Sequence, residues 1–141
     1  MPYEDEIPPY GDLSEPPPEL DALARAVIGA AIEVHRHLGP GLSEEPYQRA
    51  MGIELELRSI PFEAQKELEI IYKGVRVGKG KIDLLIAGRL VVEIKAVETL
   101  SPVHRIQTRF YMLRVGEILG LLINFNVPLL KDGIRRIIES A

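Results

Sequence analysis

Hydrophobic residues recur at three- and four-residue steps in two segments near the start of the chain, as is typical of amphipathic helices. The first segment, residues 19–38, ends before Gly39-Pro40-Gly41, a sequence that cannot continue a helix. The second segment begins at Ser43, a favourable N-cap, and continues to about Arg58. The apolar stripes consist of Leu20, Leu23, Ala24, Val27, Ala31, Val34 and Leu38 in the first helix, and of Tyr47, Ala50, Met51 and Leu55 in the second.

Short runs of strand-forming residues follow from Pro61 onward and are separated by turn residues. The predicted strands are 67–72 and 75–77 with a turn at Lys73-Gly74, two runs within 81–97, and 118–125. The run 118–125 is almost entirely apolar, as expected for a buried central strand that is reached through a helical crossover. Residues 134–138 are predicted to form either a short last strand or a helical turn.

The two runs within residues 81–97 lie on either side of Ala87-Gly88-Arg89, which fits a hairpin with a three-residue loop. That loop places Asp83 directly opposite Glu93, whereas a two-residue loop would place Asp83 opposite Ile94. Side chains alternate between the two faces of a strand, so the register set by the three-residue loop gives the hairpin one wholly apolar face. This face holds Ile82, Leu84, Ile86, Leu90, Val92, Ile94 and Ala96, and the other holds Asp83, Leu85, Val91, Glu93 and Lys95.

Two carboxylates and an ammonium group therefore lie on strands that are otherwise apolar enough to be buried. Burial of charge costs several kcal/mol per ion unless the ions are paired or bind a metal. One interpretation is a partly buried ion pair between Lys95 and either Asp83 or Glu93. The other is a site for a divalent metal ion, since Mg²⁺ is usually held by one or two carboxylates together with water and a substrate phosphate.

A third helix is predicted to begin with Ser101 as N-cap and Pro102 at the first helical position. Its predicted core face consists of Val103, Ile106, Phe110 and Leu113. On an adjacent strip, His104, Gln107 and Tyr111 lie within about 60° of one another. A plain amphipathic helix does not need a polar strip there, although boundary residues often show the same pattern. Gln107 is therefore a candidate site residue.

The length of 141 residues allows one domain with a sizeable core, and 46% hydrophobic and 27% charged residues are ordinary for a globular protein. Residues 1–18 hold six prolines, and they are predicted to form a disordered acidic tail ahead of a single domain at 19–141. The lack of cysteine excludes a disulfide framework and a thiolate metal site. Because no apolar run is long enough for a membrane span and no signal peptide is recognisable, a cytoplasmic protein without membrane contact is expected.

The formal net charge of −4 argues against a nucleic-acid partner until the distribution of charge is considered. Residues 1–18 carry five acidic and no basic side chains, so the rest of the chain has a net charge of +1. Residues 58–114 carry eleven basic and six acidic side chains, a net charge of +5. The region around the candidate site is therefore locally positive and suits a phosphate backbone, although a solvated basic face would give the same count.

The order of these elements and motifs resembles the PD-(D/E)xK nuclease superfamily, and more closely its GxxExxY protein family. The resemblance covers about residues 20–138. It rests on Gly41 to Tyr47, Tyr72-Lys73-Gly74, Asp83-Leu84-Leu85, Val92-Glu93-Ile94-Lys95-Ala96, the Gln107 to Tyr111 spacing, and Gly120 to Phe125. Pro46 departs from the family pattern, which usually has a small apolar residue there. The resemblance implies an α/β, restriction-endonuclease-like fold with an α-β-β-β-α-β core, in which helices flank a mixed sheet.

The resemblance also implies a role for each site residue. Asp83, Glu93 and the backbone carbonyl of Ile94 would hold Mg²⁺, with Mn²⁺ as a substitute, and Glu44 would reach the metal directly or through water. Lys95 would orient the attacking water or help to deprotonate it. Gln107 would position Lys95 or the scissile phosphate, with support from Tyr111.

Three functions remain open at this point. The first is a Mg²⁺-dependent phosphodiester hydrolase, a nuclease for DNA or RNA in which metal-activated water attacks the phosphate. The second is a non-catalytic adaptor that keeps the nuclease fold and binds nucleic acid or protein, and the third is a structural protein with an ion pair. The intact set of five polar residues (Glu44, Asp83, Glu93, Lys95 and Gln107) favours the nuclease. The resemblance also allows a homodimer, but the sequence does not locate its interface.

Overall fold

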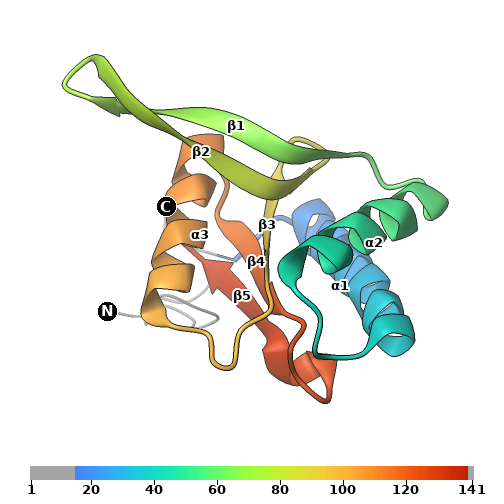
Figure 1. Cartoon of the computed structure of the whole chain (residues 1–141). Helices are drawn as coiled ribbons and strands as arrows, with labels where there is room; N and C mark the ends of the chain where they lie inside the picture. Colours follow the sequence, from blue (N-terminus) through green and yellow to red (C-terminus); the bar gives the residue numbers. More distant parts are fainter. Residues whose placement is uncertain (1–14, 140–141) are drawn as a thin grey trace.

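A mixed five-stranded sheet lies at the centre of the structure, and helices cover both of its faces (Figure 1). The computed structural model describes residues 15–139. Its elements are α1 (Pro18–Leu38), α2 (Glu44–Leu57), β1 (Phe62–Tyr72), β2 (Val75–Ile86), β3 (Leu90–Lys95), α3 (Pro102–Val115), β4 (Leu119–Asn124), the 3-10 helix η2 (Leu130–Gly133) and β5 (Ile134–Ile138). The strand order is β1-β2-β3-β4-β5, with β3 and β4 parallel and the other neighbours antiparallel. The predicted α/β fold, a mixed sheet flanked by helices, is confirmed.

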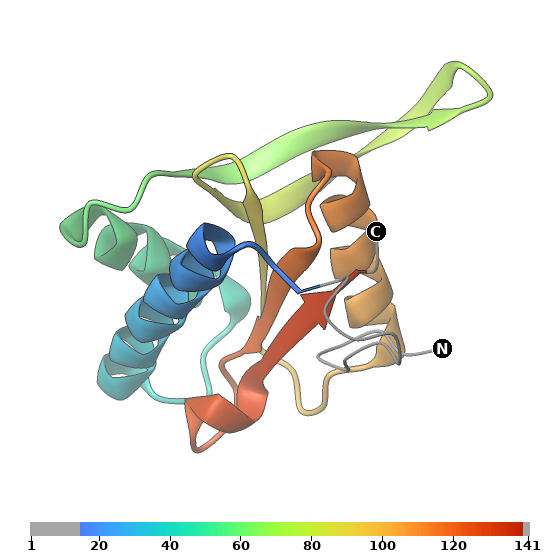
Figure 2. The same ribbon diagram turned by 180° about the vertical axis from the view of Figure 1, so that it is seen from behind.

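Helices α1 and α2 pack side by side on one face of the sheet (Figure 1, Figure 2). The predicted apolar stripes supply the buried residues of both helices, among them Leu20, Ala24, Val27, Ala31 and Val34 of α1 and Tyr47, Met51 and Leu55 of α2. Helix α1 begins at Pro18, one residue earlier than predicted, because the missing N–H of proline costs nothing at a helix start. Of the predicted tail, residues 1–14 lie outside the described residues, and residues 15–17 precede the helix.

Strands β1 and β2 form one long antiparallel hairpin in place of the short separate strands predicted for this region. The turn at Lys73-Gly74 is confirmed, and both residues have left-handed φ angles, 49° and 82°. We call the end of this hairpin, residues 67–81, the arm. Its tip projects well beyond the rest of the sheet (Figure 1).

The hairpin between β2 and β3 has the predicted register. Leu84 pairs with Val92 and Ile86 with Leu90, which confirms the three-residue loop and excludes the shorter one. The apolar face is also confirmed from Leu84 onward, since its residues pack against α1 and α2. The prediction is wrong for Ile82, which lies in the cluster under α3. Pairing with β3 ends at Leu84, and from there β2 continues into the arm, which passes over the end of α3 (Figure 1).

Helix α3 covers the opposite face of the sheet, and the structure overturns its predicted core face. Val103, Ile106, Phe110 and Leu113 are 69%, 48%, 37% and 54% exposed, whereas Thr108, Tyr111 and Met112 are buried. Two glycines of the sheet allow this docking. A Cβ at Gly120 would lie 2.6 Å from the Met112 sulfur, and one at Gly80 would lie 3.0 Å from the Tyr111 ring. The helix therefore turns Thr108, Tyr111 and Met112 toward the sheet, while Gln107 of the predicted polar strip stays exposed at the edge of this contact.

Strand β4 is buried at every position and runs parallel to β3, as predicted for a central strand that follows a crossover helix. Residues 134–138 form a strand, β5, antiparallel to β4, which settles the choice between a strand and a helical turn. Within residues 15–139, no helix has both the length and the apolar character that a membrane span requires.

Candidate active site

Asp83 of β2 and Glu93 of β3 lie just beyond the point where the two strands stop pairing through their backbones. There the N–H of Asp83 donates to Glu93 Oε2 at 2.9 Å, and the N–H of Ile94 donates to Asp83 Oδ2 at 2.8 Å. One oxygen of each carboxylate thus accepts a backbone N–H of the neighbouring strand, as a backbone carbonyl would in a regular antiparallel sheet. In the described part of the chain, the second oxygen of each carboxylate accepts no hydrogen bond, and neither carboxylate forms an ion pair with Lys95.

The two carboxylates disfavour each other's charge. Burial raises the pKa of Glu93 from 4.5 to about 8, with the charge of Asp83 as the second cause, and Glu93 is only 2% exposed. Burial likewise raises the pKa of Asp83, against the opposing effects of the Ile94 N–H and the Lys95 charge. The protein groups around this pair therefore do not fully compensate two negative charges, which is the electrostatic condition for binding a cation.

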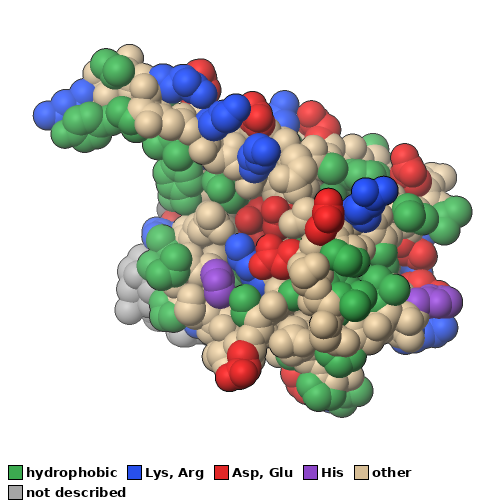
Figure 3. Space-filling model, in the orientation of Figure 1, with side chains coloured by type: hydrophobic (Ala, Val, Ile, Leu, Met, Phe, Trp, Pro, Cys, Tyr) green, Lys and Arg blue, Asp and Glu red, His purple; other side chains and the backbone are tan. Residues whose placement is uncertain are grey.

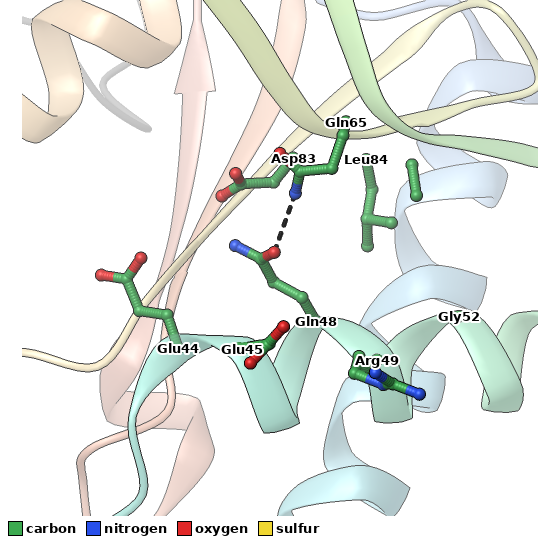
Figure 4. Close-up of a pocket in the computed structure, with 9 residues that line it drawn as sticks. Glu44, Glu45, Gln48, Arg49, Gly52, Gln65, Asp83 and Leu84 are labelled. Carbon is green, nitrogen blue, oxygen red and sulfur yellow. Dashed lines mark hydrogen bonds between the residues drawn. The ribbon is translucent and has the colours of Figure 1, made fainter.

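Glu44 reaches the same region from the first turn of α2. It lines a pocket of about 560 Å³ together with Asp83, and Figure 4 shows both side chains extending into this space, one from α2 and one from β2. The charge of Glu44 contributes to the raised pKa of Asp83 and of Glu93. Figure 3 shows acidic side chains gathered in the hollow at the centre of this face, below the arm.

The start of α2 is fixed by Tyr47. Its buried ring stacks on Phe125 at a centroid distance of 4.7 Å, and its hydroxyl donates to the carbonyl of Gly39 and accepts the N–H of Leu42. Ser43 occupies the predicted N-cap position, although its side chain makes no capping hydrogen bond. Tyr47 thus ties the loop before α2 to the end of β4, and this contact positions Glu44.

Lys95, Gln107 and Tyr111 lie together where β3 meets α3. Lys95 Nζ donates to Gln107 Oε1 at 3.4 Å. The Tyr111 hydroxyl interacts with the Gln107 side chain and the backbone of Lys81, while burial and the charge of Glu93 raise the pKa of Tyr111. The polar strip predicted on α3 therefore faces the two acidic strands, and it connects the ammonium group of Lys95 to the helix.

His104 completes this strip. Its Nδ1 accepts the N–H of Ser101 at 3.1 Å, so the neutral ring carries its proton on Nε2. Burial lowers the pKa of His104, the charge of Lys95 lowers it further, and that of Glu44 acts in the opposite direction. His104 is therefore a neutral hydrogen-bond donor at pH 7, near both Lys95 and Glu44.

Sequence reasoning missed Gln48 and Gln65, which line the pocket beside Asp83. The amide of Gln65 donates to Gln48 Oε1 at 2.8 Å across the pocket (Figure 4). Gln65 lies in β1 opposite Asp83, between the pairs Ala64–Leu84 and Lys66–Ile82, and has a left-handed φ of 54°. A non-glycine residue in this conformation costs of order 1 kcal/mol, and within a strand such strain is a feature that clusters at functional sites. No local sequence pattern signals either glutamine.

Comparison with known proteins identifies the fold. A model of the PD-(D/E)XK nuclease superfamily matches residues 21–137. The chain belongs to this superfamily. The match extends from α1 to β5 and includes all the candidate residues described above. No curated protein and no solved structure matches the chain significantly.

Nucleases of the PD-(D/E)XK superfamily are typically metal-dependent. Within residues 15–139, no group of three or more His, Cys, Asp or Glu is placed to hold a metal ion. The structure thus brings Asp83 and Glu93 together but does not add Glu44 to them as a third ligand. Two carboxylates still suit Mg²⁺, which keeps several water ligands. The undercompensated Asp83–Glu93 pair fits such an ion.

Proposed function

We propose that the protein is a metal-dependent phosphodiester hydrolase that acts on DNA or RNA. The observation that carries the proposal is the buried pair of like charges on β2 and β3, next to an ammonium group held by Gln107. A bound cation would offset the electrostatic cost of this pair, and membership of a nuclease superfamily points to the same metal-dependent chemistry.

In this proposal Asp83, Glu93 and the carbonyl of Ile94 would hold Mg²⁺ or Mn²⁺, and Glu44 would contribute through water. The bound ion would lower the pKa of a water molecule and neutralise charge on the phosphate oxygens. The N–H of Ile94 already fixes one oxygen of Asp83, and the N–H of Asp83 fixes one oxygen of Glu93. The remaining oxygen of each carboxylate is then available to the metal.

Lys95 would orient the attacking water and stabilise negative charge on the phosphate, with Gln107 holding its ammonium group in place. Tyr111 would position Gln107 through its hydroxyl, and it is a positioning residue in this sense. The Nε2–H of neutral His104 would donate a hydrogen bond to a phosphate oxygen or to the leaving oxygen.

We also propose membership of the GxxExxY family within the superfamily. The structure gives its signature a physical meaning that supports the assignment. Gly41 has a φ of 105°, Glu44 begins α2 beside the acidic strands, and Tyr47 anchors the loop against Phe125. The unusual Pro46 is exposed in the first turn of α2, where proline is tolerated.

A non-catalytic adaptor is the second candidate. One observation favours it, since each carboxylate of the pair already accepts a backbone N–H and so retains some stabilisation without a cation. An adaptor would bind nucleic acid or protein on the same face without cleavage.

Cleavage assays with Mg²⁺ or Mn²⁺ on single-stranded, duplex and branched DNA and on RNA test the proposal. The wild type is expected to cut at least one substrate, and Lys95→Ala to lower the rate at least about 100-fold while binding persists. Lys131→Ala, at an exposed lysine of η2, is the matched control and should leave the rate unchanged. Binding without cleavage by the wild type would favour the adaptor, and equal activity of Lys95→Ala would overturn the assigned site.

A further inference from the structure

A hollow of about 310 Å³ lies between β1 and α3, and we call it the arm–helix hollow. Its walls are mostly apolar or aromatic, and none of the described residues that line it is charged. The lining residues are Ile70 of β1 and Val103, Ile106, Gln107, Phe110 and Tyr111 of α3. Val103, Ile106 and Phe110 are 69%, 48% and 37% exposed. Clustered apolar exposure of this kind marks binding sites in folded proteins.

Gln107 belongs both to the arm–helix hollow and to the candidate active site. Its side-chain oxygen accepts a hydrogen bond from Lys95 Nζ at 3.4 Å, and its side chain also interacts with the Tyr111 hydroxyl. Figure 3 shows hydrophobic side chains below the arm, beside the central hollow that holds the acidic side chains. The arm–helix hollow is thus one side chain away from Lys95. A sugar or base attached to a phosphate at Lys95 would reach it.

The surroundings of the arm–helix hollow are positively charged. Lys95 contacts Gln107, and the Arg114 guanidinium lies over the Phe110 ring, 5.6 Å from its centroid. The arm carries four basic and two acidic side chains, a net charge of +2, and Figure 3 shows Lys and Arg side chains along it. Both ion pairs of the arm are more than half exposed and therefore weak. An apolar hollow among cations suits an aromatic group on a polyanionic chain, which describes a nucleobase.

The dimensions and lining of the arm–helix hollow suit a base that is not paired. Such a base can stack on the Phe110 ring and pack against aliphatic side chains, while the Gln107 amide offers a donor and an acceptor to its polar edge. In a duplex the bases are stacked and paired, so one would enter the hollow only after it is flipped out. A single strand offers its bases without the cost of unstacking and unpairing.

We propose that the arm–helix hollow binds one unpaired base of a DNA or RNA strand whose backbone crosses the Asp83–Glu93 pair. This inference rests on the proposed function, because it takes a phosphate of the strand to lie at Lys95. It adds the class of substrate, which is a single strand or the unpaired segment of a branched molecule. It also gives a role to the apolar residues on the outer side of α3. Phe110 and Ile106 bind the base and take no part in the hydrolysis.

The test is the affinity of the full chain for labelled oligomers, measured by fluorescence anisotropy in a chelator so that no metal-dependent cleavage occurs. The ligands are an oligodeoxyuridine, an oligouridine, a DNA duplex, and an oligomer of abasic deoxyribose phosphates, all at one salt concentration. The abasic oligomer has the charge of the oligodeoxyuridine but no bases. The wild type should bind the oligodeoxyuridine or the oligouridine about 5- to 100-fold more tightly than the abasic oligomer, as expected for a stacked base. The tighter of the two distinguishes DNA from RNA as the source of the base.

Phe110→Ala should lower the affinity for the preferred single strand at least about 5-fold, and Ile106→Ala should lower it by a smaller factor. Neither variant should change the affinity for the abasic oligomer or for the duplex. Leu113→Ala is the matched control, because Leu113 is 54% exposed on the same helix and is not among the residues that line the hollow. It should bind every oligomer as the wild type does. Circular dichroism should show the same helix content for all variants.

Equal affinity of the wild type for the abasic oligomer and for both single strands would overturn the proposal. An equal loss of affinity in Phe110→Ala and Leu113→Ala would overturn it as well. The result can be separated from that of the cleavage assays. Base-dependent binding by a protein that cuts no substrate would support the base site and contradict the proposed hydrolase. Cleavage by a protein whose affinity does not depend on the bases would support the hydrolase and exclude the base site.

Discussion

The face of the sheet under α1 and α2 is filled by apolar side chains, whereas the face under α3 combines a small apolar cluster with buried polar groups. On the first face, nineteen buried apolar residues of the described chain, 15–139, form one cluster. On the second, seven buried apolar residues lie beside Glu93 and Thr108, and Tyr111 turns its hydroxyl toward Gln107. The molecule thus separates a stabilising side from a side where charge is held at a cost.

This difference predicts that equal truncations on the two faces have unequal effects, most of all at the two phenylalanines. Phe125 is fully buried against Tyr47, while Phe110 is partly exposed on the outside of α3. Phe125→Ala should lower the free energy of unfolding by about 3–5 kcal/mol. Phe110→Ala should lower it by less than about 1 kcal/mol in dilute solution. Urea denaturation measures both values, and equal losses would contradict the comparison.

The second prediction concerns the cost of the buried charge. The pKa of Glu93 is raised to about 8 in the folded chain from 4.5, so the native state binds a proton between these pH values that the unfolded state has lost. The stability that this proton provides is fully present below pH 4.5 and is lost as the pH rises through 8. In metal-free solution, Glu93→Gln should therefore match the wild type near pH 4 and be more stable by up to a few kcal/mol at pH 9.

Thermal or urea unfolding in the presence of a chelator, repeated at several pH values, measures this difference. The matched control is Glu98→Gln, at an exposed glutamate in the loop after β3, and its stability relative to the wild type should not change over this pH range. A Glu93→Gln variant that is less stable than the wild type at pH 9 would mean that the charged carboxylate stabilises the fold, and the second face would then hold its charge without a cost.

The same division explains which features could be predicted from the sequence. The stripes of α1 and α2, the register of the β2–β3 hairpin and the buried strand β4 follow from hydrophobic periodicity, because packing alone decides those positions. The motif residues Asp83, Glu93, Lys95 and Gln107 could be located from spacing and family resemblance. The core face of α3 could not be predicted, because the docking of the helix depends on Gly80 and Gly120, which have no side chain. This docking leaves the apolar stripe of α3 exposed to solvent. Gln48 and Gln65 depend on the approach of α2 to β1, which no local pattern encodes.

The third prediction tests the docking of α3 through two neighbouring glycines of β2. A Cβ at Gly80 would lie 3.0 Å from the Tyr111 ring and hydroxyl, whereas a Cβ at Gly78 would meet nothing within 4 Å. Gly80→Ala should therefore cost about 1–2 kcal/mol of stability and displace Tyr111 from Gln107. Gly78→Ala should change stability by less than about 0.5 kcal/mol. Chemical denaturation compares the two variants, and an equally small change at both positions would show that α3 docks more loosely than the structure indicates.

The smallest stability effect is expected at Gln65, which lies in the pocket between α2 and β1, beside Asp83. Gln65→Gly relieves the strain of a φ of 54° but removes the exposed hydrogen bond to Gln48, so the two changes should offset to within about 0.5 kcal/mol. Gln65→Ala keeps the strain and also loses the hydrogen bond, so it should be about 1 kcal/mol less stable than Gln65→Gly. Thermal unfolding of the three proteins gives this order. If Gln65→Ala were as stable as Gln65→Gly, the left-handed backbone beside Asp83 would carry no strain, and Gln65 would lose its claim to a role in the pocket.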